Sequence, residues 1–174
     1  MQHFFPDPDD PKMTPFTRAF VRMMFAHAEF ERRVSELVTL ITQQPGFGEQ
    51  SKNRFSAKNR AKEVEKLCSN GASKHPAGLP ETEAIVRLLN DAYPLCSDRN
   101  WLAHGNWWAM DTTAGVITVR AATEYPDEPL HRNFTIEEID RTSSNLRDLE
   151  AELYKLQSAI EGRLSADTQV SKQE

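Results

Sequence analysis

The chain has 174 residues, of which 39% are hydrophobic and 27% charged, and its net charge is −5. This length fits one domain with a real core, and the composition is that of an ordinary globular protein. The acidic balance excludes a protein that holds nucleic acid by overall positive charge, so any RNA contact requires a local basic cleft. No apolar run approaches the ~18 residues of a membrane span, and we expect a cytoplasmic protein.

The two ends of the chain and its cysteines set further limits. The N-terminal stretch is rich in proline and aspartate and lacks the apolar core of a signal peptide. We predict a flexible arm over residues 1–13, a single domain over 14–164 and a flexible polar tail over 165–174. Cys68 and Cys96 lie in helical apolar patterns without zinc-ligand spacing, which predicts buried free thiols in a reducing compartment. We expect no metal site and no cofactor.

A long apolar stripe predicts the first helix. It begins at Thr14–Pro15, because threonine is a good N-cap and proline is favoured in the first turn. It continues to Pro45–Gly46, a sequence that stops helices. Such a stripe indicates a bundle core or a dimer seam. Its members recur at spacings of four and three: Phe16, Phe20, Met23, His27, Phe30, Val34, Leu37 and Ile41.

Two shorter helices are predicted next. The second covers residues 55–69, and its basic side, which includes Arg60, is interpreted as a solvated face. The third starts at Pro80. Pro94 lies inside it and should kink or split it, because proline removes a backbone donor and crowds the preceding turn. Gly105 is well placed to end this helix in a left-handed cap.

A small β-hairpin is predicted before the last helix. Trp107–Met110 and Val116–Arg120 are rich in aromatic and β-branched residues around a glycine-bearing turn, and 130–134 can form a third short strand. Thr135 and Glu138 then form a capping box that opens a long closing helix. The fold class predicted is mainly α, an up-down bundle of four to five helices with a small β-hairpin inserted before the last helix.

One short pattern carries chemistry, since Arg99 is followed five positions later by His104. The spacing alone is weak, because Arg22 and His27 repeat it within the first helix. Context separates the two pairs. His27 lies on the apolar stripe, which favours a satisfied core or interface histidine. His104 lies at a helix end just before Gly105, where side chains can face a cleft.

The segment 98–105, with the sequence DRNWLAHG, resembles the signature of HEPN domains. In that signature an arginine, a polar residue, three further residues and a histidine lie near the end of a helix in a bundle. The order of elements over residues 14–164 is also similar to that family. The resemblance implies an HEPN-like homodimer with a shared cleft and metal-independent RNA cleavage. It makes Arg99 and His104 the catalytic pair and Asn100 their polar neighbour.

These residue types suit the implied reaction. Attack of an RNA 2′-OH on the adjacent phosphate needs one group that takes the proton and another that stabilises the phosphorane charge. Histidine, which titrates near pH ~6.5 in peptides, exchanges protons at neutral pH, and arginine binds phosphate through two parallel donors. The products are a 2′,3′-cyclic phosphate and a 5′-OH. On an ideal helix Arg99 and His104 lie about 140° apart, so we expect a loosened helix end or a site completed by a second subunit.

Three functions compete. The first is this endoribonuclease, acting as a toxin or a defence effector with an antitoxin or nucleotidyltransferase partner. The second is a non-catalytic HEPN-like dimer that binds RNA, a nucleotide or a partner protein. The third is a regulatory or scaffold bundle, in which Arg99 pairs with a carboxylate such as Asp98, His104 caps its helix, and the two lie apart. The tryptophans can stack on bases, but the favoured interpretation is core packing for Trp101 and hairpin packing for Trp107 and Trp108.

Overall fold

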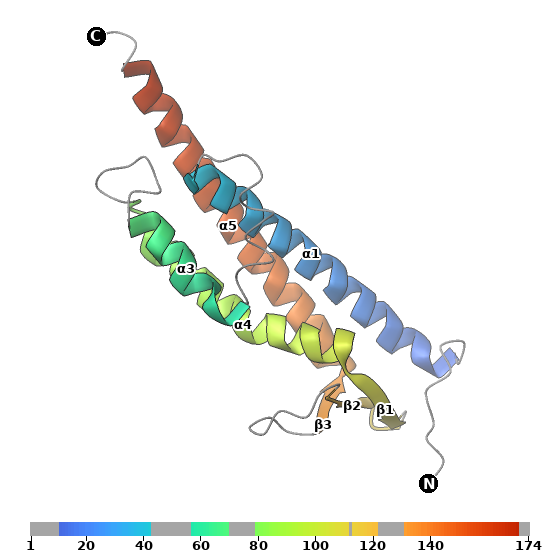
Figure 1. Ribbon diagram of the computed structural model, residues 1–174. Helices are drawn as coiled ribbons and strands as arrows, with labels where there is room; N and C mark the ends of the chain where they lie inside the picture. The colour runs from blue at the N-terminus through green and yellow to red at the C-terminus, as the bar shows by residue number, and fades with distance from the viewer. Residues whose placement is uncertain (1–10, 43–56, 70–78, 112, 122–130, 171–174) are drawn as a thin grey trace. The chain divides into compact units, whose positions relative to one another are not determined.

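The computed structural model describes residues 11–42, 57–69, 79–111, 113–121 and 131–170, which form four α-helices and one three-stranded sheet (Figure 1). The predicted mainly helical fold class, with a hairpin before the last helix, is confirmed for these residues. None of the helices in these ranges is long and apolar enough to cross a membrane.

The elements follow one another in the predicted order. The stop predicted at 45–46 lies outside the described residues. The last helix continues to Val170, so the predicted flexible tail is helical from residue 165 up to that point. The elements are a 3-10 turn (Pro11–Met13), α1 (Thr14–Thr42), α3 (Ala57–Ser69), α4 (Thr82–His104), β1 (Asn106–Asp111), β2 (Val116–Arg120), β3 (His131–Thr135) and α5 (Ile136–Val170).

The chain forms two compact units, each assembled from distant parts of the sequence. Unit 1 comprises Met1–Ala28 and Pro94–Leu146, and unit 2 comprises Glu29–Tyr93 and Arg147–Glu174. Helices α1, α4 and α5 each contribute one part to unit 1 and another to unit 2. The elements of the domain predicted over 14–164 are thus shared between these two units.

Unit 1 contains the sheet, in which β1 and β3 both pair antiparallel with β2. The hairpin turn is closed by Asp111, whose Oδ1 accepts hydrogen bonds from the backbone N–H groups of Thr113 and Ala114. Gly115 has a φ of 63°, a left-handed conformation that glycine adopts without strain. Met13, predicted to lie in the flexible arm, belongs to the core that one face of this sheet covers: Met13, Phe16, Ala19, Met23, Leu102, Ile117, Val119, Phe134 and Ile139.

Local signals account for the helix boundaries. The predicted capping box is confirmed, since the Glu138 N–H donates to Thr135 Oγ1 at 3.1 Å and the Thr135 N–H donates to the Glu138 carboxylate at 2.8 Å. At the start of α4, the Thr82 hydroxyl donates to the Leu79 carbonyl at 2.6 Å. Pro94 lies inside α4, which passes through it as one helix, so the predicted split does not occur.

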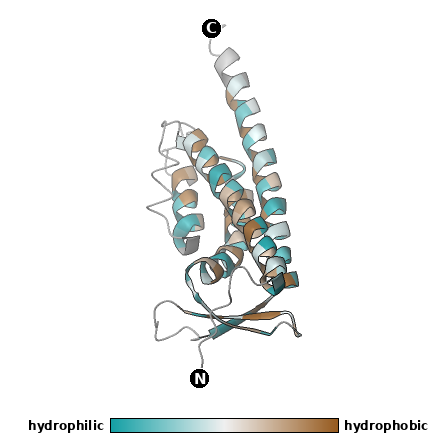
Figure 2. Ribbon diagram, turned by 90° about the vertical axis from the view of Figure 1, so that its right-hand side faces the viewer, coloured by the Kyte–Doolittle hydropathy of each residue, from teal (hydrophilic) through white to brown (hydrophobic). Residues whose placement is uncertain are grey.

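Unit 2 is built from helical segments that bury the predicted apolar stripes; Figure 2 shows hydrophobic and hydrophilic residues side by side along the helices. The prediction that Arg60 lies on a solvated face is wrong. Arg60 is only 8% exposed, because its guanidinium binds the Glu31 carboxylate at 2.5 Å. Cys68 is buried and forms no disulfide with a described residue, as predicted, and burial raises the pKa of its thiol. The core of this unit includes Phe30, Val34, Leu37, Val38, Ile41, Val64, Ile85, Leu88, Leu153 and Ile160.

Candidate active site

The motif residues lie at the end of α4, directly ahead of the sheet (Figure 1). Only Gly105 separates His104, the last residue of α4, from Asn106, the first of β1. A Cβ at Gly105 would lie 2.3 Å from Val119 Cγ1 and 2.5 Å from the carbonyl oxygen of Trp101, so only glycine fits this junction. The φ of Gly105 is not left-handed, so the predicted left-handed cap is wrong. Glycine is required here by close approach instead.

The buried side of α4 is fixed to the core of unit 1. Leu102 is 2% exposed, and its carbonyl oxygen accepts a hydrogen bond from Trp107 Nε1 at 2.8 Å. The Trp107 ring meets Phe20 edge to face, with ring centroids 5.5 Å apart. On the same turns of α4, Asn100 and His104 are exposed. The last turns of the helix are therefore held on one side and present polar side chains on the other.

The three predicted catalytic residues meet on these exposed turns. Arg99 Nη1 donates to Asn100 Oδ1 at 3.0 Å and lies 3.5 Å from His104 Nε2. Since α4 remains helical through His104, the long arginine side chain, not a loosened helix end, spans the angle of about 140° between the two positions. A guanidinium can only donate. The contact is therefore a hydrogen bond when His104 carries its ring proton on Nδ1 and offers Nε2 as the acceptor.

Asp98, directly before the motif, is held by two other elements of unit 1. Arg132 of β3 binds its Oδ1 at 2.5 Å, and the hydroxyl of Thr142 in α5 donates to its Oδ2 at 3.4 Å. The carboxylate proposed as an alternative partner for Arg99 is thus occupied by Arg132. The Nε of Arg99 is buried and has no hydrogen-bond partner among the described residues.

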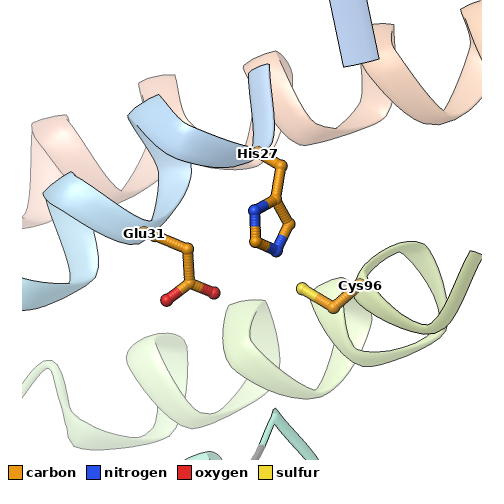
Figure 3. A group of neighbouring side chains, drawn as sticks. All are labelled: His27, Glu31 and Cys96. Carbon is orange, nitrogen blue, oxygen red and sulfur yellow. The ribbon is translucent and has the colours of Figure 1, made fainter. Parts of the chain in front are cut away.

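The second pair with the same spacing is arranged differently. Arg22 donates to the Asp140 carboxylate three times, through Nε at 3.0 Å and through Nη2 at 2.7 and 3.0 Å. His27 points toward Cys96 of α4 (Figure 3), and the ligand atoms of these two side chains lie within 4.8 Å of one another. Glu31 follows one turn further along α1, and a guanidinium binds its carboxylate. The sequence shows no cysteine–histidine spacing here, because the two residues belong to different helices.

The three tryptophans do not share one environment. Trp101 packs, partly buried, against the core of unit 1, as predicted. Trp107, which was predicted to pack within the hairpin, is also partly buried against this core. Trp108 instead lies beside Arg120, whose guanidinium carbon is 5.3 Å from the ring centroid, and beside His131, with ring centroids 6.2 Å apart. The sequence assigned no role to His131, which only the pairing of β3 with β2 brings to this place.

A scan against protein-family models finds no family that matches the chain, and searches of the curated proteins and of the solved structures find no match. The resemblance to HEPN domains therefore rests on the sequence, above all on the residues of segment 98–105.

Proposed function

We propose that the chain is a metal-independent endoribonuclease of HEPN type that acts on RNA as a homodimer. The observation that carries the proposal is the 3.5 Å approach of Arg99 Nη1 to His104 Nε2 on exposed turns of α4, with Asn100 in the same hydrogen-bonded group. Arg22 and His27, which have the same spacing, turn to other partners. A cation that binds phosphate and a group that exchanges protons are the two parts that this reaction needs.

In the proposed reaction, Arg99 leaves His104 Nε2 when it binds the phosphate. The freed Nε2 of neutral His104 then takes the proton of an RNA 2′-OH, and the 2′-oxygen attacks the adjacent phosphorus. Arg99 binds the non-bridging oxygens and stabilises the negative charge of the phosphorane. The bond between phosphorus and the 5′-oxygen breaks, and the leaving oxygen takes a proton from water or from the partner's His104. The products are a 2′,3′-cyclic phosphate and a 5′-hydroxyl.

The hydrogen bonding of Arg99 supports its role as the phosphate ligand. Its bond to Asn100 fixes the plane of the guanidinium, so the remaining donors point in set directions. Its Nε–H is buried without a partner among the described residues, an arrangement that costs about 1–3 kcal/mol. Because this atom is buried, a phosphate would bind the guanidinium through its terminal nitrogens.

A second candidate is a non-catalytic HEPN-like dimer that binds RNA, a nucleotide or a partner protein. The net charge of −5 favours it, since phosphate binding supplies most of the affinity of nucleases for RNA. The scaffold hypothesis is less well supported, because it requires Arg99 and His104 to lie apart.

A cleavage assay with EDTA present and a mixed RNA pool as substrate tests the proposal. We expect wild type to leave cyclic-phosphate ends, and His104→Ala and Arg99→Ala to lose at least about a hundredfold in rate. His27→Ala and Arg22→Ala are the matched controls and should cleave as wild type does. Cleavage by folded His104→Ala at the wild-type rate contradicts the proposal. A folded wild type that binds RNA without cutting it favours the second candidate.

A further inference from the structure

The outer face of the sheet in unit 1 carries side chains that the proposed catalytic residues do not use. Ile117, Val119 and Phe134 turn into the core, so the residues that alternate with them in β2 and β3 lie on the opposite face. These residues are Val116, Thr118, Arg120, His131, Asn133 and Thr135.

Trp108 of β1 also lies on this face, at a β-bulge. Trp107 pairs with Val119 and Ala109 pairs with Thr118, so Trp108 is the extra residue between two consecutive pairs. Trp107 keeps its place against the core, whereas Trp108 and Ala109 follow each other on the outer side. Without the bulge, the alternation of β1 would carry Ala109 inward.

An aromatic ring, a guanidinium and an imidazole meet on the outer face, and we call them the Trp108 platform. Arg120 lies over the Trp108 ring at 5.3 Å, and the His131 ring is tilted against it at 6.2 Å between centroids. Trp108 is half-buried and His131 is exposed. Beside them, the Thr118 hydroxyl donates to Asn133 Oδ1 at 2.8 Å.

The platform lies at the end of the sheet that is joined to α4. Asn106, two residues after His104, pairs with Arg120, and Arg120 pairs with His131. Two residues of chain span at most about 7 Å. Asp111, an acidic residue of the same face, lies at the other end of β1, where backbone N–H groups of the turn bind it.

We propose that the Trp108 platform stacks against an unpaired base of single-stranded RNA whose backbone passes Arg99 and His104. This inference rests on the proposed function. Aromatic rings and arginine planes bind unpaired bases in this way without reading the sequence, and the charge of Arg120 complements the phosphates. The platform would supply the local basic contact that a chain of net charge −5 needs in order to hold RNA.

Binding is measured on the His104→Ala protein, so that cleavage does not interfere. The probe is a fluorescein-labelled single-stranded RNA of about ten nucleotides, followed by fluorescence anisotropy at fixed salt. We expect Trp108→Ala and Arg120→Ala, each added to His104→Ala, to raise Kd about 5- to 20-fold. Trp108→Phe keeps a ring and should change Kd less than about threefold.

Tyr154 provides a matched control in unit 2. Its ring is 53% exposed and also has an arginine over it, because Arg33 lies 4.6 Å from the ring centroid. That guanidinium also binds Glu150. Tyr154→Ala in the His104→Ala protein should leave Kd unchanged.

Equal Kd values with and without Trp108→Ala, in proteins that are folded by circular dichroism, would overturn the inference. An RNA duplex that competes as well as the single strand would also overturn it, because stacking needs unpaired bases. If Trp108→Ala does not fold, Arg120→Ala provides the test, and an unchanged Kd in that variant would overturn the inference. Cleavage that persists in His104→Ala, with RNA binding that still depends on Trp108, would overturn the proposed function. The inference that the Trp108 platform binds RNA would then still hold.

Discussion

Unit 1 contains two arginine–histidine pairs with the same spacing, and their surroundings give them different chemistry. In the middle of α1, Arg22 forms three hydrogen bonds with Asp140 of α5, and His27 points toward another helix. At the end of α4, Arg99 Nη1 lies 3.5 Å from His104 Nε2. The spacing fixes the direction in which each side chain leaves its helix. It does not decide what each side chain meets.

The segments of chain immediately after the two histidines explain the difference. After His27, α1 continues to Thr42, so the first pair lies within an uninterrupted helix, where Arg22 binds Asp140. After His104, the helix stops at Gly105 and a strand leaves on the buried side, so the second pair keeps an exposed side. Helix ends and the loops next to them are where ligands most readily reach side chains.

Replacing Arg99 by lysine keeps the positive charge at this position but removes the planar guanidinium that contacts His104. Among the predictions that follow, we expect this substitution to have the largest effect. Lysine offers a point charge in place of a planar fork, so kcat/KM for metal-free cleavage should fall about 10²–10³-fold. Arg22→Lys is the matched control and should retain the wild-type value. If Arg99→Lys cleaves as fast as wild type, charge alone is sufficient and Arg99 makes no bidentate phosphate contact.

Substitution of the residue that follows each histidine should also distinguish the two pairs, through its effect on stability. Gly105→Ala places a Cβ against Val119 and two carbonyl oxygens, so we expect the free energy of unfolding to fall by about 3 kcal/mol. Ala28→Gly is the reverse substitution at the position after His27. It should lower the free energy of unfolding by about 1 kcal/mol, the usual difference between alanine and glycine within a helix. Urea denaturation measures both. A Gly105→Ala protein as stable as wild type would mean that the junction between α4 and β1 is looser than the close approach indicates.

Most of the fold could be predicted because its signals are local. The apolar periodicity of α1, the capping box of Thr135 and Glu138, and the hairpin turn each depend on residues a few positions apart. The errors concern partners that are distant in sequence. Arg60 is buried because Glu31 receives it, and Gly105 is required because β2 approaches it, and neither neighbour is visible in a local pattern.

The residues of the candidate site also differ in whether a local sequence pattern could predict them. Arg99, Asn100 and His104 were predicted from one short segment, because a motif on one helix needs no knowledge of tertiary structure. Trp108 was predicted to pack within the hairpin, and it lies beside Arg120 of the neighbouring strand β2. Its contact with His131 depends on the pairing of β3 with β2, which no local pattern shows.

The smallest effect that we expect concerns the ion pair that occupies Arg22. Its two side chains are 47% and 41% exposed, so solvent screens the attraction, and a double-mutant cycle with Arg22→Ala and Asp140→Ala should give a coupling free energy below about 1 kcal/mol. High salt should reduce it further, and cleavage should not change in any member of the cycle. A coupling above about 2 kcal/mol would make Arg22 a structural requirement of unit 1. It would then be a poor control for Arg99, and the comparison would rest on the two histidines.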